Sequence, residues 1–283
     1  MVFMKISGFT IVRNALKYNY PVLESIRSIL PLVDEFIVNV GKSEDGTLEL
    51  IRSIQDPKIR IIETAWDMSQ GHTVLSEQTN RALSECTGDW AFYLQSDEVI
   101  HEDDLPKLKC LMERHLEDPA VEAIRFRWFH FYGSYFRYRV DSGWYQKQDR
   151  IIRNNGQIHS IGDAYGFERK DRQPLKRLVT RCFVYHYGWV HPADMMTTRR
   201  VNAENIGFTS LENSERKDDY RYGDMGRFPI YFGTHPAVMK ERIRVDEGSQ
   251  SDYDRIRRQY WWSPLRLFKI RYKTVKRVRE RIA

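Results

Sequence analysis

The 283-residue sequence lacks long hydrophobic runs and contains few cysteines. No apolar stretch approaches the roughly 20 residues that a membrane-spanning helix needs, and residues 1–30 carry no signal-peptide pattern. The three cysteines, Cys86, Cys110 and Cys182, are odd in number and widely spaced, which disfavours a disulfide framework and a zinc site. Internal repeats and low-complexity linkers are also absent. We therefore expect a globular protein with reduced thiols that is made and kept in the cytoplasm.

The positive charge is concentrated at one end of the chain. The net charge is +6, but residues 255–283 contain 11 Lys and Arg against one acid, so the rest of the chain is net acidic. Large apolar residues recur at helical spacing in this tail, a pattern typical of a helix on an anionic membrane. A helix packed on the domain with a solvated basic face explains the pattern equally well. Nucleic-acid binding is the least favoured interpretation, because only this terminal segment is basic.

The first hundred residues alternate between predicted strands and predicted helices. Apolar runs of strand length alternate with segments of helical periodicity, and turn or capping residues separate them. The predicted strands are residues 9–12, 35–40, 58–64 and 90–94, and the predicted helices are residues 22–30, 48–54 and 73–85. This alternation predicts a doubly wound, mostly parallel α/β sheet with right-handed connections.

The stretch from residue 89 to residue 100 organises the rest of the chain. A predicted buried strand, central and parallel, runs directly into Asp97 and Glu98. Ligands of open α/β sheets bind outside the carboxyl ends of such strands. A carboxylate at this position is suited to hold a divalent cation, which in turn holds a diphosphate. The alternative is a structural role for these acids, as the cap of a helix that begins near Asp103.

Beyond about residue 120 the pattern changes. Residues 124–138 contain eight aromatic side chains, interleaved with arginines, and their alternation favours strands with one buried aromatic face. We expect this mixed, aromatic-rich half to supply the pocket of a second substrate. A plain aromatic core is the alternative.

Four segments carry a family resemblance. They read FTIVRN (residues 9–14), DEFIVNVGKSEDGT (34–47), QTNRAL (78–83) and WAFYLQSDE (90–98). In this order and spacing they resemble the family 2 glycosyltransferases of the GT-A type, well over roughly residues 5–105 and in scattered matches until about residue 240. The resemblance implies a nucleotide-sugar-binding half (1–115), an acceptor-binding half of the same GT-A-like domain (116–245) and a basic amphipathic tail (246–283). It also implies a nucleotide diphosphate sugar as donor and an acceptor hydroxyl.

The resemblance implies donor-binding roles for residues at the strand ends. Asn39 stands where the family usually has an acid that contacts the base or the ribose, and its amide offers a donor and an acceptor instead of a charge. For Asp45 a helix cap is an equally good interpretation. For Arg150 and Arg153 a surface ion pair is the commoner role of an arginine. The candidate donor-binding residues are Thr10, Val12, Arg13, Asn39, Gly41, Asp45, Asn80, Gln95, Arg150 and Arg153.

The triplet Gln95-Ser96-Asp97 resembles the Asp-x-Asp signature of the family with its first acid replaced. Asp97 is then the main charged ligand of Mg²⁺ or Mn²⁺, and Gln95 offers only a neutral oxygen. His186 lies in residues 184–192, which resemble a His-Tyr-Gly-Trp segment of related transferases, and is expected to complete the metal shell. Transfer without a metal is the alternative for the site, and a core position is the alternative for His186.

A base is needed to take the proton of the acceptor if the reaction inverts the anomeric centre. The family places such an acid in the second half of the chain, and Asp163 is our candidate, with Asp141 and Asp149 as competitors. A Gly-Asp step is also typical of a plain turn. Glu98 is expected to support this site or to touch the sugar.

The sequence therefore predicts a metal-dependent, inverting glycosyltransferase with a glycan or lipid-linked acceptor. We expect a place in bacterial surface-glycan synthesis (lipopolysaccharide, capsule or glycoconjugate), in the cytoplasm or peripherally on the inner face of the membrane. A non-catalytic nucleotide-sugar or glycan-binding module is the alternative, because Gln95 replaces an acid and a His-Glu pair common in the family is missing. No GxGxxG fingerprint follows a predicted strand, which disfavours a dinucleotide cofactor.

Overall fold

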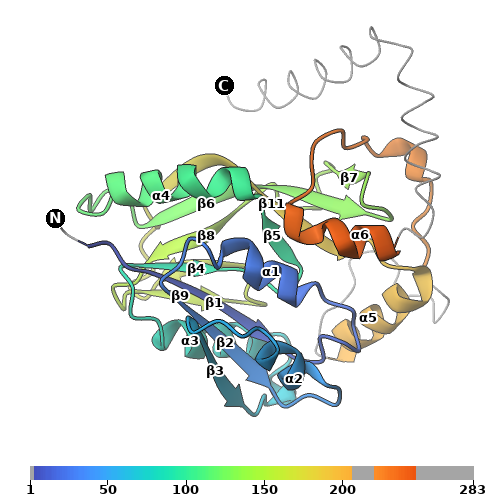
Figure 1. Cartoon of the computed structure of the whole chain (residues 1–283), viewed down its shortest axis with the longest axis horizontal. Coiled ribbons are helices and arrows are strands. Elements are labelled where there is room, and N and C mark those ends of the chain that lie inside the picture. The colour runs from blue at the N-terminus through green and yellow to red at the C-terminus, as the bar shows by residue number, and fades with distance from the viewer. Residues whose placement is uncertain (1–2, 206–219, 247–283) are drawn as a thin grey trace, which may run out of the picture. The chain divides into compact units, whose positions relative to one another are not determined.

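A computed structural model describes residues 3–205 and 220–246 (Figure 1). The described residues up to Met239 form one compact unit, and α6 (Lys240–Asp246) belongs to a second unit. The basic tail at residues 255–283 lies outside the described residues, so its predicted helix and membrane contact stay predictions. The division of the chain at residues 115 and 245 also stays a prediction. None of the helices in the described ranges is both long and apolar enough to cross a membrane.

One large mixed sheet carries the first unit, in the order β3-β2-β1-β4-β8-β6-β11-β5, with β7 paired to β6. The first four strands of this order are parallel to one another, and from β8 onward the directions are mixed. A separate hairpin pairs β9 with β10. The strands are β1 (Ile6–Val12), β2 (Glu35–Gly41), β3 (Ile59–Thr64), β4 (Trp90–Tyr93), β5 (Glu98–Ile100), β6 (Ala123–Tyr132), β7 (Tyr138–Arg139), β8 (Lys147–Arg153), β9 (Ile158–Ile161), β10 (Gly166–Arg169) and β11 (Arg177–Trp189).

The helices connect and cover this sheet, as the alternating pattern predicts. The predicted fold class, a mostly parallel α/β sheet followed by a mixed, aromatic-rich half, is confirmed. The helices of the first unit are α1 (Val22–Ile29), α2 (Thr47–Arg52), α3 (Thr73–Ser84), α4 (Leu105–Arg114) and α5 (Ala193–Asn205), with 3₁₀ turns η1 (Met68–Gln70), η2 (Glu102–Asp104), η3 (Met225–Arg227) and η4 (Ala237–Met239).

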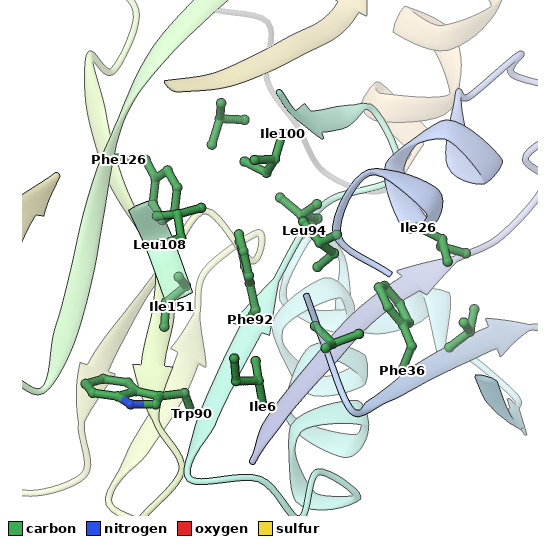
Figure 2. Packing of buried hydrophobic residues seen from close by; sticks show 14 of the residues in the cluster. Ile6, Ile26, Phe36, Trp90, Phe92, Leu94, Ile100, Leu108, Phe126 and Ile151 are labelled. Carbon is green, nitrogen blue, oxygen red and sulfur yellow. The ribbon is translucent and has the colours of Figure 1, made fainter. Parts of the chain in front are cut away.

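Strands β1, β2 and β4 are buried on both faces because each face packs into its own core. In β4, Trp90 and Phe92 face a core that includes α1 and α4, with Ile26 and Leu108 among its members (Figure 2). The intervening side chain of Tyr93 faces a second core that contains residues of α3 and of the β9–β10 hairpin. Burial on both faces explains why β4 is a continuous apolar run and why it lies in the middle of the sheet.

Strand β5 was not predicted. The sequence interpretation places Asp97 and Glu98 after a strand and before a helix near Asp103. Instead Glu98 begins β5, which pairs antiparallel with β11, and α4 begins at Leu105 after a 3₁₀ turn. The cap of that turn is the side chain of His101, which accepts from the backbone N–H of Asp103.

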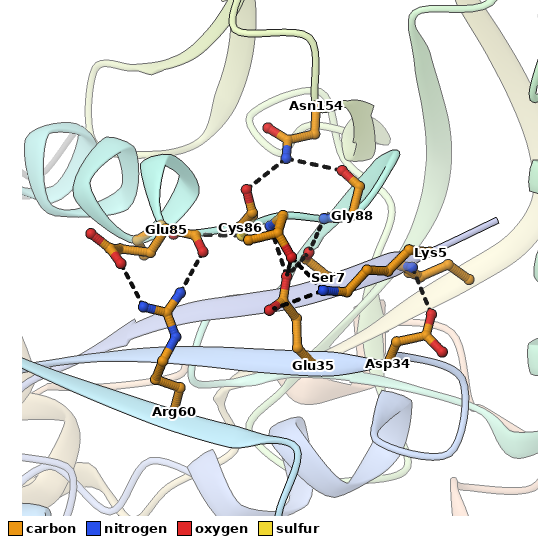
Figure 3. A network of polar contacts seen from close by, with 12 residues as sticks. Lys5, Ser7, Asp34, Glu35, Arg60, Glu85, Cys86, Gly88 and Asn154 are labelled. Atoms are coloured by element: carbon orange, nitrogen blue, oxygen red, sulfur yellow. Dashed lines mark hydrogen bonds and ion pairs between the residues drawn. The ribbon is translucent and has the colours of Figure 1, made fainter. Parts of the chain in front are cut away.

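The amino ends of the parallel strands are closed by internal hydrogen bonds (Figure 3). The carboxylate of Glu35 accepts from the Ser7 hydroxyl at 2.5 Å and from the backbone N–H of Thr87 at 2.7 Å. The Ser7 oxygen in turn accepts from the N–H of Gly88 at 2.8 Å. Burial alone would raise the pKa of Glu35, but these hydrogen bonds lower it below its usual value. These polar groups at the amino ends of the strands bind one another, so their role is structural.

Candidate active site

A pocket of about 270 Å³ opens at the opposite end, where the parallel strands finish. Its walls come from the residues that follow β1, β3 and β4, from the loop between β9 and β10, and from α5. The carboxyl ends of parallel strands are where sheets of this class bind ligands. Five of the candidate residues line this pocket: Val12, Arg13, Gln95, Asp97 and Asp163.

Asp97 is the acidic centre of the pocket. Its Oδ2 lies 3.5 Å from Nε2 of His186 and 3.9 Å from Nη2 of Arg199. Burial alone would raise the pKa of Asp97, but His186 and Arg199 lower it to about 2. The carboxylate is therefore ionised at every physiological pH. Gly188 makes the approach possible, because a Cβ there would lie 2.6 Å from Oδ2 of Asp97 and 2.8 Å from Nε2 of His186.

A second histidine sets the orientation of His186. The Nδ1 atoms of His130 and His186 lie 3.0 Å apart, and Nε2 of His130 lies 2.7 Å from the carbonyl oxygen of Tyr145. A carbonyl only accepts, so His130 donates from Nε2. Burial lowers the pKa of His130 to about 3, which keeps its ring neutral and makes its Nδ1 the acceptor. His186 therefore donates from Nδ1 and turns Nε2 toward Asp97.

Asp97 and His186 could supply two ligands to a divalent cation, which is fewer than a metal site needs by itself. Among the residues at 3–205 and 220–246, no three His, Cys, Asp or Glu side chains converge on one point. The protein supplies an oxygen from Asp97 and a nitrogen from His186. The ring of His186 is oriented by the hydrogen bond that its other ring nitrogen, Nδ1, donates to His130, and such a bond is usual for a histidine that binds a metal. Magnesium keeps several waters and substrate oxygens in its shell. The two side chains therefore suit a metal that arrives with a diphosphate.

The side chain of Gln95, expected to face the metal, forms a hydrogen bond with the loop between β9 and β10. Its Nε2 donates to the carbonyl oxygen of Ala164 at 3.2 Å. Ala164 has φ 62°, a left-handed conformation that is uncommon for a residue with a Cβ, and Gly162 has φ 58°. Asp163 stands between these two residues. The amide of Gln95 thus holds the loop that presents Asp163 to the pocket, a bond that an ionised acid at position 95 could not donate.

Arg199 in α5 is a pocket residue that the sequence analysis missed. Its Nη1 donates to the carbonyl oxygen of Gly188 at 2.6 Å, and its guanidinium lies over the ring of Tyr20 at 4.2 Å. Its Nη2 is buried and has no hydrogen-bond acceptor within the described part of the chain. A guanidinium donor at the wall of a pocket is chemically suited to bind an anionic group. No local sequence pattern points to Arg199, because it stands next to Arg200 in a helix with little amphipathic character.

Several candidate donor residues lie beneath the pocket. Thr10 donates from its hydroxyl to the carbonyl of Leu94 at 2.6 Å, which ties the end of β1 to the end of β4. Asn80 exchanges two hydrogen bonds with the backbone of Ser160 and so ties α3 to strand β9. Asn39 is fully buried, so its amide does not reach the pocket.

The structural alternative for Asp45 is the one observed. Its carboxylate accepts from the backbone N–H of Thr47 at 3.0 Å, at the start of α2, and from the N–H of Lys17 at 2.7 Å. The competing candidate bases are likewise occupied. Asp149 is held by Arg125 and Arg177, and Asp141 is held by Arg139. None of these three acids lines the pocket.

Glu98 and Arg150 form a fully buried ion pair behind Asp97. Both side chains have no exposed surface, and two hydrogen bonds of 2.7 Å join them. Glu98 also accepts from the backbone N–H of Gln95 at 3.1 Å, so the pair supports the turn that carries Asp97. Neither residue lines the pocket, and the expected contact of Arg150 with a diphosphate stays a prediction.

Arg153 lies at the far end of β4 from the pocket. It pairs with Trp90 at the start of that strand, and its guanidinium donates to backbone carbonyls of residues 115–121. The register between β4 and β8 places Arg153 beside Trp90, the first residue of β4, whereas the pocket lies beyond the last residue of that strand. The expected contact of Arg153 with a diphosphate stays a prediction.

Comparisons with known proteins agree with these observations in part. Residues 8–178 match the sequence profile of the family described as Glycosyl transferase family 2. No curated protein matches the chain. Among solved structures, TarS of S. aureus is 17% identical, with a TM-score of 0.44, over 73% of this chain and 41% of that one. The chain thus spans less than half the length of that relative.

Two further structures are similar to the chain. A 1–349 form of S. aureus TarS in complex with UDP-GlcNAc is 17% identical, with a TM-score of 0.44, over 74% of this chain and 68% of that one. A mannosyltransferase from Pyrobaculum calidifontis in complex with GDP-Man and Mn²⁺ is 20% identical, with a TM-score of 0.34, over 43% of this chain and 34% of that one.

Proposed function

The chain belongs to glycosyl transferase family 2, which confirms the resemblance of its strand-end motifs, and we propose that it transfers a sugar from a nucleotide diphosphate sugar to an acceptor hydroxyl. One observation carries this proposal. Asp97, which Arg199 and His186 keep ionised, and Asp163 line the same pocket at the end of the parallel strands. A site for a diphosphate and a carboxylate base are the two groups that such a transfer requires.

Each of these residues has a role in the proposed reaction. Asp97 and His186 would hold Mg²⁺ or Mn²⁺, and a bound divalent cation neutralises charge on the leaving nucleoside diphosphate. Arg199 donates from Nη2 to a phosphate oxygen. Asp163 takes the proton of the acceptor hydroxyl while that oxygen attacks the anomeric carbon and the bond from this carbon to the diphosphate oxygen breaks. Attack opposite to the leaving group inverts the anomeric centre.

The acceptor and the setting belong to the same proposal. We infer a glycan or lipid-linked acceptor in bacterial surface-glycan synthesis, with the enzyme on the cytoplasmic side of the membrane. The basic, aromatic composition of residues 255–283 supports this, because such segments are attracted to anionic lipid.

The test is a transfer and hydrolysis assay with a panel of UDP-, GDP-, CDP- and dTDP-sugars, with Mg²⁺, Mn²⁺ or EDTA. Asp97→Ala should lower kcat/KM at least about 100-fold, because the site of the diphosphate loses its charge anchor. Asp163→Asn should lower kcat by roughly 10²–10⁴-fold and leave donor affinity unchanged, as expected for a lost general base. Asp103→Ala removes an exposed carboxylate outside the pocket and should behave like the wild type.

Wild-type-like activity of Asp97→Ala would remove the proposed role of this residue. Tight binding of a nucleotide sugar without turnover, under every metal tested, would instead favour the non-catalytic binding module.

A further inference from the structure

The pocket has two chemically different ends. Asp97 and Arg199 make one end charged. At the other end Trp66, Met68 and Leu75, from the segment between β3 and α3 and from α3 itself, make it apolar and aromatic. None of these three apolar residues belongs to the motifs that carry the family resemblance. A ligand that fills the pocket should therefore combine an anionic group with a flat, weakly polar group.

Trp66 is held rigidly at the apolar end. Its indole Nε1 donates to the hydroxyl oxygen of Thr64 at 3.1 Å, and that oxygen lies 2.6 Å from Oδ1 of Asn39 and 2.9 Å from Oε1 of Gln78. The ring also lies directly against Gly41, where a Cβ would be 2.6 Å from Cε2 of Trp66. Because the only polar atom of the indole is used inside the protein, the ring offers a ligand its π-face alone.

The same hydrogen bonds remove Asn39 from ligand recognition. Its Nδ2 donates to the backbone oxygen of Gln78 at 2.9 Å and lies 3.1 Å from Oε1 of that side chain. The buried amide thus spends its donor and its acceptor on Gln78 and Thr64. The residue that the resemblance assigns to the base or ribose acts here as a support beneath Trp66.

The spacing of the strands matches a nucleotide. Trp66 lies against Gly41 at the end of β2, and Asp97 follows β4, with β1 between these strands. Two strand spacings of about 4.8 Å separate the two ends by roughly 10 Å. A nucleoside diphosphate has this reach between its base and its outer phosphate.

We propose that Trp66 is the stacking platform for the nucleobase of the donor, with Thr64, Asn39 and Gly41 as the residues that position it. This assignment rests on the proposed function, because it names a subsite of the same pocket. Stacking on a fixed aromatic ring tolerates any base, since every base has a π-face. In this proposal Asn39 does not contact the edge of the base.

The experiment is calorimetric titration of the full-length protein with UDP, GDP and inorganic pyrophosphate in the presence of Mg²⁺. Trp66→Ala should weaken binding of both nucleotides roughly 5-fold to 100-fold, the range for loss of one base–aromatic stack. Pyrophosphate, which has no base, should bind this variant as it binds the wild type, and that result also shows that the variant is folded. Trp66→Phe should keep nucleotide affinity within a few-fold.

Gly41→Ala provides an independent test, because it leaves the tryptophan in the sequence and displaces its ring. It should weaken UDP and GDP as Trp66→Ala does and spare pyrophosphate. With nucleotide sugars, both variants should raise the donor KM and leave kcat nearly unchanged.

The outcomes separate this inference from the proposed function. If Trp66→Ala binds UDP and GDP like the wild type while Asp97→Ala loses pyrophosphate, the stacking assignment is wrong and the donor site stands. If the wild type binds neither nucleotide, both the assignment and the donor site are overturned. Equal losses for pyrophosphate and nucleotides in Trp66→Ala also contradict the assignment, because they would report a general disruption of the pocket.

Discussion

The two halves of the sheet bury polar groups of different kinds. In the described residues before Glu98, the fully buried polar side chains are neutral, among them Thr10, Asn39 and Gln78, while the carboxylates of Glu35 and Asp97 keep some exposed surface. From Glu98 onward most of the buried polar side chains are ionisable. The latter include Glu98, His101, Glu122, His130, Arg139, Asp149, Arg150, His186, His191 and Arg199.

This difference assigns a physical task to each half. Neutral polar groups cost little to bury once their hydrogen bonds are made, so the parallel half forms a neutral frame. A charged interior is stable only when each charge has its partner, which fixes side-chain geometry closely. The boundary falls between Asp97 and Glu98, so the pocket lies where the neutral frame meets the charged interior.

The largest effect should come from breaking the buried ion pair of the mixed half. Glu98→Ala leaves Arg150 buried without a partner, which should cost about 3–5 kcal/mol of unfolding free energy. The matched change in the parallel half is Thr10→Val, which removes one neutral hydrogen bond and should cost about 0.5–1.5 kcal/mol. Urea denaturation of the two variants measures both values.

The double variant Glu98→Leu with Arg150→Met is the control for this comparison. Removing both charges should recover most of the stability that Glu98→Ala loses, because no charge then remains unpaired. Equal costs for Glu98→Ala and Thr10→Val would show that the two interiors do not differ in the way described.

An intermediate effect should appear at the boundary itself. The pKa of Asp97 is lowered from 3.8 to about 2, so its ionised form stabilises the folded state above the unfolded pKa, and this contribution is lost as the pH falls through about 2. Asp97→Asn should therefore cost roughly 2 kcal/mol at pH 6 and progressively less toward pH 3 and below. Denaturation at several pH values measures this trend. A cost that stays constant with pH would contradict the assigned charge state.

The smallest effect concerns the reactivity of the buried thiols, which should be equally low in the two halves. Burial raises the pKa of Cys86 in the parallel half to about 12, and it also raises the pKa of Cys182 in the mixed half. Only Cys110 is exposed among the three. A thiol reagent at pH 8 should therefore modify one thiol in the native protein and none in Cys110→Ser. Rapid modification of two or three thiols in the wild type would show that one of the interiors opens easily.

The same contrast explains which features the sequence predicted. Strands such as residues 35–40 and 90–94 are apolar on both faces and are bounded by turn residues, so local pattern is sufficient to find them. Strand β5 begins with Glu98, whose burial depends on Arg150, 52 residues later in the chain. No local pattern contains that information.

The candidate site shows the same limit. Asp97 and Asp163 were placed in one pocket by a resemblance whose motifs follow strand ends, and the structure brings them there. Asn39 in β2, Asp45 in the turn before α2 and Asn80 in α3 are also polar candidates, but each has its partner inside the protein. A sequence names the polar groups at a strand end, and only the three-dimensional neighbours decide whether these groups face a ligand.

The short link between β4 and β5 determines the curvature of the sheet. From Tyr93 to Glu98 the chain advances five residues, which extend to at most about 17 Å. In the strand order, β5 is four places from β4, and four spacings in a flat sheet are about 19 Å. The sheet therefore curves, so that its edge strand β5 lies nearer to β4 than it would in a flat sheet. The segment with Gln95 and Asp97 is the connection that requires this curvature. A longer connection between β4 and β5 would relax this curvature, so the segment that carries Asp97 also holds the edge strand of the curved sheet near β4.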